Sequence, residues 1–165
     1  MKKKVSIIGG GSWGTALASQ LANNNHQTLI YVRDNNLRDN INEQHINTQY
    51  FPDIKLSDLI TATSNLKEAV NYGEYIVMAV PTDATRKVME QIESYLKPQQ
   101  TIISTAKGIE EGTHLRNSQI ISEYSSNPVV VLSGPTHAEE VIKELPSAAV
   151  IAADERRTAE KCQDL

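Results

Sequence analysis

The sequence predicts an α/β domain built on a doubly wound, mostly parallel sheet with helices on both faces. Short apolar runs at residues 5–8, 28–32 and 75–80 alternate with segments whose apolar residues recur at helical spacing. Runs that are apolar at nearly every position are typical of parallel strands buried on both faces. Parallel neighbours require right-handed crossovers, which place helices on both sides of the sheet. The 165 residues suffice for one such domain.

The alternation of strands and helices continues along the chain. The expected strands are residues 5–8, 28–32, 60–63, 75–80, 101–104, 129–132 and 148–152. The expected helices are residues 13–22, 37–46, 66–70, a segment capped by Thr82 or Asp83 and ended by Pro98, residues 115–124, and a segment after Pro135. Residues 47–57, which include Pro52, are expected to form a surface loop.

The last segment, from Asp154 to Leu165, is expected to open a further helix with Asp154 as its cap. No glycine, asparagine or proline ends this helix before the chain stops. We therefore expect residues 1–165 to be one truncated domain, with a second domain lost beyond Leu165.

Composition and charge narrow the classes of partner. Lys and Arg total 16 against 20 Asp and Glu, and the net charge of −4 gives no general attraction to a nucleic-acid backbone or an anionic membrane. The single Cys162 cannot form an internal disulfide, and no apolar stretch approaches the roughly 20 residues that span a bilayer. Glycines interrupt the apolar run after Lys4 too early for a secretory signal. We expect a cytoplasmic protein that binds neither nucleic acid nor membrane, with surface histidines at His26, His45 and His114.

A glycine pattern lies between the first expected strand and the first expected helix. Gly9, Gly11 and Gly14 form G-x-G-x-x-G in a strand, turn, helix arrangement. The first glycine permits a tight turn, the second lets the backbone approach a pyrophosphate, and the third lets the helix pack closely on the sheet. Free amides and the positive end of the helix dipole then stabilise the anion. This placement predicts a Rossmann-type dinucleotide-binding domain rather than a merely tight turn.

The end of the second expected strand bears on the choice of cofactor. An acidic residue there accepts hydrogen bonds from the adenosine ribose, whereas an arginine suits a 2′-phosphate. Arg33 and Asp34 are adjacent, so the side chain nearer the ribose decides the preference. The sequence favours Arg33 and NADP(H) over NAD(H), against the alternative that Arg33 is a solvated surface residue.

Two loops that follow expected strands carry candidate ligand-binding groups. Lys107, in the loop after residues 101–104, could hold a cation against a phosphate or a developing alkoxide. Residues 133–140 offer backbone amides and the Thr136 hydroxyl to an anionic substrate or to the nicotinamide end of a cofactor. A solvated lysine and a proline-stiffened connection are the alternatives. We expect no metal site, because no metal-binding motif includes the potential ligands His137, Glu139 and Glu140.

Five short segments occur in this chain in a fixed order. Together they identify a protein family far more specifically than the glycine pattern alone. They are residues 9–18 (GGGSWGTALA), 47–52 (NTQYFP), 79–81 (AVP), 106–109 (AKGI) and 132–141 (LSGPTHAEEV). With these segments the chain resembles the bacterial NAD(P)-dependent glycerol-3-phosphate dehydrogenases over nearly its whole length. The resemblance implies an amino-terminal dinucleotide-binding domain that precedes a helical domain, and it assigns the general-base lysine to that helical domain.

The resemblance also implies roles for individual residues. The implied cofactor contacts are Gly9, Gly11, Ser12, Trp13, Gly14, Arg33, Tyr50, Lys107 and Ala138. The implied substrate contacts are Lys107, Gly134 and Thr136. Lys107 is also the implied catalytic residue, because its charge can stabilise the changing charge of the substrate oxygen.

The implied reaction interconverts sn-glycerol 3-phosphate and dihydroxyacetone phosphate with NAD(P)(H) and supplies glycerol phosphate for phospholipid synthesis. No residue here is a convincing base for the substrate alcohol, so the chain alone is expected to bind dinucleotide weakly and to have little or no activity. A full-length protein is expected to form a homodimer. Two alternatives stay open at this point: a stand-alone dinucleotide-binding module that senses redox state, and a related hydroxyacid or acyl-CoA dehydrogenase.

Overall fold

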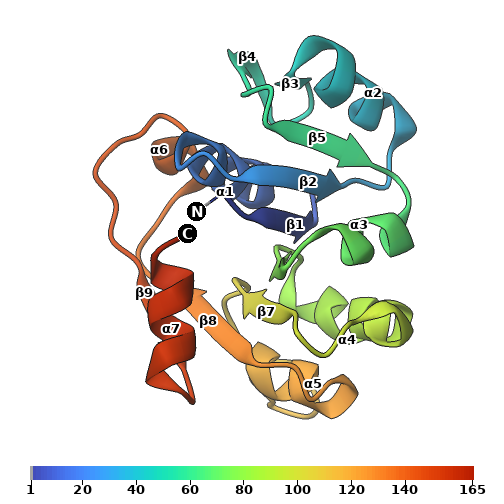
Figure 1. The fold of residues 1–165 in the computed structure, drawn as a ribbon, viewed down its shortest axis with the longest axis vertical. Coiled ribbons are helices and arrows are strands. Elements are labelled where there is room, and N and C mark those ends of the chain that lie inside the picture. Colours follow the sequence, from blue (N-terminus) through green and yellow to red (C-terminus); the bar gives the residue numbers. More distant parts are fainter. Residues whose placement is uncertain (1) are drawn as a thin grey trace.

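The computed structural model describes residues 2–165 and contains a seven-stranded sheet flanked by helices, with a separate two-stranded sheet (Figure 1). The strands of the main sheet are β1 (Lys4–Ile8), β2 (Gln27–Tyr31), β5 (Ile60–Thr63), β6 (Tyr75–Met78), β7 (Thr101–Ser104), β8 (Val129–Ser133) and β9 (Val150–Ala153). The smaller sheet pairs β3 (Ile46–Asn47) with β4 (Phe51–Lys55). The helices are α1 (Ser12–Asn23), α2 (Asn35–Gln44), α3 (Leu66–Tyr72), α4 (Thr82–Ile92), the 3-10 turn η1 (Glu93–Tyr95), α5 (Asn117–Tyr124), α6 (Ala138–Val141) and α7 (Arg156–Gln163).

The order of strands in the main sheet is β5-β2-β1-β6-β7-β8-β9. Every neighbouring pair is parallel except β8 and β9, which run antiparallel. The chain first adds β2 and β5 on one side of β1 and then returns to place β6 on the other side. Open sheets of this kind bind ligands at the carboxyl ends of the strands where the order reverses, here between β1 and β6. The predicted doubly wound, mostly parallel sheet is confirmed.

Alternate residues of the central strands face two hydrophobic clusters, one on each side of the sheet. On β1, Val5 and Ile7 pack in a cluster with α1, α2, α6 and α7, whereas Ile8 packs with α3, α4 and α5. On β6, Val77 joins the first cluster and Ile76 the second. Burial of each large aliphatic side chain contributes roughly 1.5–3 kcal/mol, so a one-residue slip of either strand is strongly disfavoured.

The loop expected at residues 47–57 is instead largely a β-ribbon, and this prediction was wrong. β3 and β4 pair antiparallel with an irregular register, and Phe51 is buried against the core. Pro52 is compatible with β4 because this strand pairs on one side only. The preceding helix α2 ends at Gln44, two residues early, because His45 adopts a left-handed conformation with φ of 56°.

The starts of two helices also differ from expectation. α4 begins at Thr82 with Pro81 as its N-cap residue, so neither Thr82 nor Asp83 is the cap. Proline suits this place because it has no amide hydrogen that would need an acceptor. The N-cap of α7 is Glu155 rather than Asp154, and its side chain forms no capping hydrogen bond.

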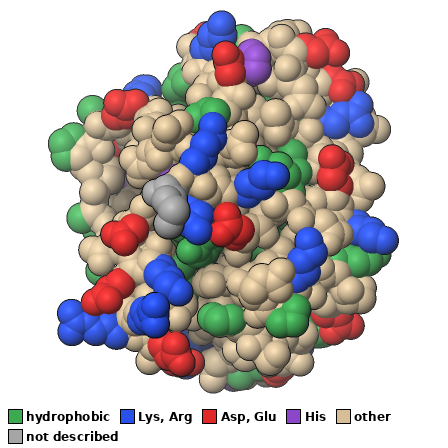
Figure 2. Space-filling model, viewed as in Figure 1, with side chains coloured by type: hydrophobic (Ala, Val, Ile, Leu, Met, Phe, Trp, Pro, Cys, Tyr) green, Lys and Arg blue, Asp and Glu red, His purple; other side chains and the backbone are tan. Residues whose placement is uncertain are grey.

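The surface gives two further observations about possible partners. Within residues 2–165, no helix combines the length and the apolar character needed to cross a bilayer. On the face drawn in Figure 2, Lys and Arg side chains are interspersed with Asp and Glu, and hydrophobic side chains are scattered. This face therefore presents no extended patch of a single charge.

His26 is buried, which corrects the expectation that it lies at the surface. It is 5% exposed, and its Nδ1 accepts a hydrogen bond from the Lys3 backbone amide at 3.0 Å. Burial, reinforced by the nearby charge of Lys3, lowers the pKa of His26 below its usual value. The unfolded chain therefore binds a proton at His26 more readily than the folded chain does.

This difference predicts a specific acid sensitivity. As pH falls from about 7 to about 5, protonation of the unfolded chain at His26 should lower the free energy of unfolding. His26→Gln stays neutral and keeps an acceptor for the Lys3 amide, so urea titrations across this range should show a shallower loss of stability. His114→Asn, at an exposed histidine, serves as the control. Identical pH dependence in wild type and His26→Gln would contradict the assignment.

Candidate functional site

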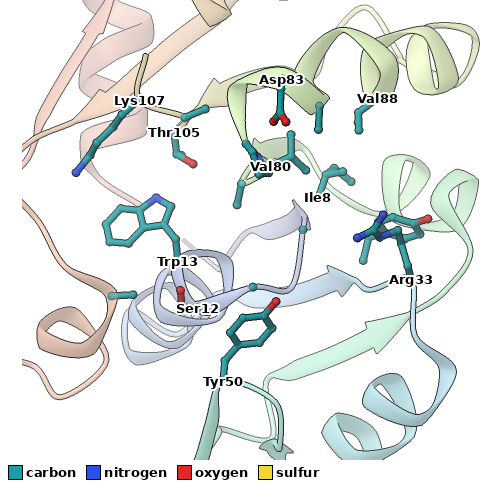
Figure 3. A pocket seen from close by; sticks show the side chains of 18 of the residues that line it. Ile8, Ser12, Trp13, Arg33, Tyr50, Val80, Asp83, Val88, Thr105 and Lys107 are labelled. Atoms are coloured by element: carbon teal, nitrogen blue, oxygen red, sulfur yellow. The ribbon is translucent and has the colours of Figure 1, made fainter. Parts of the chain in front are cut away.

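A cleft with a volume of about 1100 Å³ lies at the carboxyl ends of the central strands, where the strand order reverses (Figure 3). The turn between β1 and α1 forms one side, and α4 with the loop before it forms another. The loop after β7, the start of α6, the end of β2 and Tyr50 also line it. The structure brings nine of the residues singled out from the sequence into this cleft: Gly9, Gly11, Ser12, Trp13, Arg33, Tyr50, Lys107, Thr136 and Ala138.

Close backbone contacts require glycine at two positions, Gly9 in the first turn and Gly14 in α1. Gly9 has φ of +116°, and a Cβ there would lie 2.5 Å from the Ala79 carbonyl oxygen. A Cβ on Gly14 would lie 1.9 Å from the Gly9 carbonyl oxygen. Gly11 differs, because its Cβ would meet nothing nearer than Tyr50 at 3.9 Å. The packing of this chain therefore does not by itself require glycine at position 11, and the space above it opens into the cleft.

The amino end of α1 presents free backbone amides to this open space. Gly11 is its N-cap residue, and among residues 2–165 no side chain caps the helix. The first amides of a helix have no partner within the helix, and they carry the positive end of its dipole. The start of α1, at Ser12 and Trp13, thus has the chemistry of an anion-binding site.

Asn47 ties the β3–β4 ribbon to this turn, and sequence reasoning missed it. Its side chain is fully buried, and Nδ2 donates to the Gly10 carbonyl at 3.1 Å and to the Thr15 hydroxyl at 2.7 Å. Its Oδ1 accepts from the Tyr50 amide at 3.3 Å. One buried amide thus fixes the glycine turn and places Tyr50 at the cleft. The segment was expected to be a loop, so nothing local marked Asn47 as buried.

Arg33 and Asp34 have separate tasks. The Asp34 carboxylate caps α2, accepting from the Asn36 and Leu37 amides at 2.8 and 3.4 Å, and its second oxygen accepts from Gln49 at 3.0 Å. Arg33 lines the cleft, at the end away from Trp13 and Lys107 (Figure 3). Within the described part of the chain it forms no ion pair. The guanidinium is therefore available to a ligand, whereas the carboxylate is engaged in the fold.

Lys107 contacts two other segments of the chain at the end of the cleft away from Arg33. Its Nζ donates to the Thr136 carbonyl at 3.3 Å and lies 6.0 Å from the centroid of the Trp13 ring. A cation at this distance from an indole ring is attracted to its face. Lys107, Trp13 and Thr136 come from three different segments, and their convergence creates a cationic end of the cleft beside an aromatic ring.

Two expected residues lie outside the cleft lining. Gly14 packs beneath the turn, as described above. Gly134 lies against the segment that leads to β9, and a Cβ there would be 2.6 Å from the Ala148 carbonyl. The structure thus gives Gly134 a packing role and does not bring it to the cleft with Thr136.

The cleft also contains a helix face that sequence reasoning overlooked. Asp83, Lys87 and Gln91 recur every four residues on α4 and line the cleft. Their spacing was a usable signal, but Asp83 was expected only as a helix cap. Three cationic side chains and two carboxylates line the cleft, the cations being Arg33, Lys87 and Lys107. The site is thus locally cationic in a chain whose net charge is −4.

Comparisons with known proteins agree with this geometry. Residues 4–159 match the family described as the N-terminus of NAD-dependent glycerol-3-phosphate dehydrogenase. The chain is 54% identical over 165 residues to glycerol-3-phosphate dehydrogenase [NAD(P)+] of Halothermothrix orenii, covering all of this chain and 48% of that protein. It is 44% identical over 162 residues to the Clostridium botulinum protein of the same name, covering 98% and 49%.

A solved structure has the same fold. The crystal structure of glycerol-3-phosphate dehydrogenase from Coxiella burnetii superposes with a TM-score of 0.91 at 25% identity, over 99% of this chain and 51% of that one. The chain thus spans about half the length of the relatives that it matches. The fold, the cleft at the strand reversal and these matches lead to one assignment: the chain belongs to the family of NAD-dependent glycerol-3-phosphate dehydrogenases, of which it represents the amino-terminal domain.

Proposed function

We propose that this chain is the cofactor-binding part of an enzyme that interconverts sn-glycerol 3-phosphate and dihydroxyacetone phosphate with a nicotinamide dinucleotide. The observation that carries the proposal is the uncapped start of α1 beside Gly11, a glycine that the packing of the chain does not require. A pyrophosphate needs such amides and such an open approach. The family match favours this function over a redox-sensing module and over hydroxyacid or acyl-CoA dehydrogenases. By supplying glycerol phosphate, the enzyme would serve phospholipid synthesis.

The cleft residues would hold a dinucleotide along its length. The amides of Ser12 and Trp13 would bind the pyrophosphate, and Arg33 with Tyr50 would contact the adenosine half. Lys107 and Ala138 would lie toward the nicotinamide half, with Thr136 on the substrate side. When bound, the nicotinamide supplies or accepts the hydride of the reaction.

Lys107 would be the residue of this chain that takes part in the reaction. Its ammonium is held at the cleft beside Thr136 and Trp13, where it would stabilise the charge that changes on the substrate oxygen. We assign the general base to the part of the enzyme outside this chain, in line with relatives about twice as long. The 165-residue chain alone should then have little or no activity.

The same geometry leads us to propose that NADP(H) is preferred over NAD(H). Arg33 is unpaired within the described residues, whereas both oxygens of Asp34 accept hydrogen bonds from the protein. A free guanidinium can bind a 2′-phosphate through two hydrogen bonds. An engaged carboxylate is a poorer acceptor for the ribose hydroxyls of NAD(H).

Arg33→Ala tests this preference. We expect NADPH to bind about tenfold more weakly or worse, because a charge-assisted hydrogen bond is lost, while NADH affinity changes little. Fluorescence titration of each reduced cofactor measures both dissociation constants. Arg38→Ala, which removes an arginine paired with Asp39 outside the cleft, is the matched control. Equal affinities for the two cofactors that Arg33→Ala leaves unchanged would refute the preference.

The reaction itself is tested by joining this chain to the carboxyl half of the Halothermothrix orenii enzyme. The chimera should oxidise NADPH with dihydroxyacetone phosphate, followed by absorbance, and should be inactive with a hydroxyacid-type keto acid or an acyl-CoA substrate. Lys107→Met should lower kcat/KM by about 100-fold or more, because a group that stabilises developing charge is removed. A chimera that binds NADPH but does not reduce dihydroxyacetone phosphate would show that the substrate assignment is wrong.

A further inference from the structure

A buried amide controls the backbone of the loop that carries Lys107. Asn117, the first residue of α5, is 4% exposed, and its Nδ2 lies 3.5 Å from the Ala106 carbonyl oxygen and 3.3 Å from that of Gly108. The same Nδ2 donates to the Thr82 hydroxyl at 3.0 Å, and this hydroxyl donates to the Lys107 carbonyl at 3.1 Å. An amide NH2 group has two hydrogens, so besides the Thr82 hydroxyl it serves one further acceptor, and the Gly108 carbonyl is nearer than that of Ala106. The consecutive carbonyl oxygens of Lys107 and Gly108 are therefore held by one pair of side chains.

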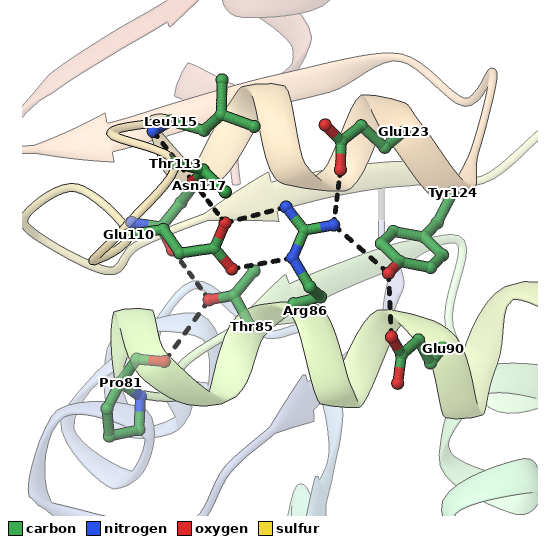
Figure 4. A network of polar contacts seen from close by, with 10 residues as sticks. All are labelled: Pro81, Thr85, Arg86, Glu90, Glu110, Thr113, Leu115, Asn117, Glu123 and Tyr124. Carbon is green, nitrogen blue, oxygen red and sulfur yellow. Dashed lines mark hydrogen bonds and ion pairs between the residues drawn. The ribbon is translucent and has the colours of Figure 1, made fainter.

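A second buried side chain fixes the orientation of this amide. Thr85 of α4 is 1% exposed, and its hydroxyl donates to Asn117 Oδ1 at 2.7 Å. Figure 4 shows Thr85 between Pro81 and Asn117, so the oxygen of the amide faces α4. Rotating the amide by half a turn would place its NH2 group against the hydroxyl and its oxygen against carbonyls. The NH2 group of Asn117 therefore points toward the loop that carries Lys107.

An ion pair holds the next part of the same loop but does not replace Asn117. Arg86 binds both carboxylate oxygens of Glu110 at 2.8 Å, and this contact lowers the pKa of Glu110 to about 2 (Figure 4). Glu110 lies two residues beyond Gly108, whose φ of +117° gives the chain a turn between the two points. The ion pair therefore anchors the far side of the turn, and the backbone around Lys107 depends on Asn117 and Thr82.

The position of this backbone decides where the Lys107 ammonium lies. From the held carbonyls its side chain reaches the Thr136 carbonyl and the face of Trp13. We propose that Asn117, together with Thr82, is a positioning residue that fixes the Lys107 loop and so places the Lys107 ammonium at the cleft. The inference rests on the proposed function for one step, the contact of Lys107 with the bound dinucleotide. Asn117 itself does not line the cleft.

Trp13 makes the test direct, because it is the single tryptophan of the chain and lies beside Lys107. Asn117→Leu removes both the donor and the acceptor group of the amide and keeps a side chain of similar volume. We expect acrylamide to quench Trp13 fluorescence more strongly, and NADPH to bind about fivefold to tenfold more weakly, measured by energy transfer from Trp13 to the reduced nicotinamide. If Asn117 acts through Lys107, adding Asn117→Leu to Lys107→Met should weaken NADPH binding no further.

Gln100→Met is the matched control for loss of a buried amide. Gln100 is 1% exposed and its side chain holds the Val70 and Gly73 carbonyls, each at 2.7 Å, at the opposite end of β7. This variant should lose stability in urea as Asn117→Leu does, with Trp13 quenching and NADPH affinity unchanged. If Asn117→Leu behaves like Gln100→Met in both readouts, or if its effect adds fully to that of Lys107→Met, the inference is wrong.

A milder pair of variants covers the case in which Asn117→Leu does not fold. Thr82→Val removes the hydroxyl that holds the Lys107 carbonyl and should increase Trp13 quenching and weaken NADPH binding, whereas Thr82→Ser should restore both. The Lys107→Met variant tests the proposed function separately from the role of Asn117. If Lys107→Met leaves NADPH affinity unchanged, the assigned contact of Lys107 is wrong, and the inference is then decided by Trp13 quenching in the Asn117 and Thr82 variants alone.

Discussion

The close approach of three backbone segments at the end of β1 is the constraint on which the site depends. The Gly9 carbonyl lies where a Cβ of Gly14 would be, and the Ala79 carbonyl lies where a Cβ of Gly9 would be. The start of α1 can therefore pack on the turn only without side chains at these two positions. A larger residue at either would push α1 away from β1 or from the end of β6. The cleft, its free amides and the position of Trp13 all follow from this contact.

The strands of the sheet determine where the loops around the cleft begin, and buried polar side chains determine the paths of these loops. Asn47 connects the β3–β4 ribbon to the glycine turn, and Asn117 connects α5 to the Lys107 loop. Both amides are almost completely buried, so each unpaired polar atom in a variant would carry a desolvation cost of about 1–3 kcal/mol. The same bonds that stabilise the fold thereby hold the cleft residues in place. Stability and the geometry of the cleft are consequently coupled at these two positions.

Local patterns predicted the parts of the fold that local forces determine. The continuous apolar runs identified the strands of the main sheet, and the placement of Gly9 and Gly14 after the first run identified the turn. The β3–β4 ribbon was missed because Phe51 lies in a short segment that is interrupted by Pro52 and Asp53, and its burial depends on a distant core. His26 was misplaced for the same reason, since its partner lies 23 residues away in the sequence. Asn117 looked like an ordinary polar residue, and only the packing of α4 against α5 brings its side chain to the Lys107 loop.

The neighbours Arg33 and Asp34 show how tertiary contacts resolve an ambiguity that spacing leaves open. Either residue could face a ribose, because both follow the same strand. Capping of α2 engages Asp34, since two orphan amides of that helix need an acceptor. Gln49, from the segment between β3 and β4, takes the remaining carboxylate oxygen. Of these two neighbours, only Arg33 is left with its charge facing the cleft. In this way the need to satisfy one helix end determines the electrostatic character of the site beside it.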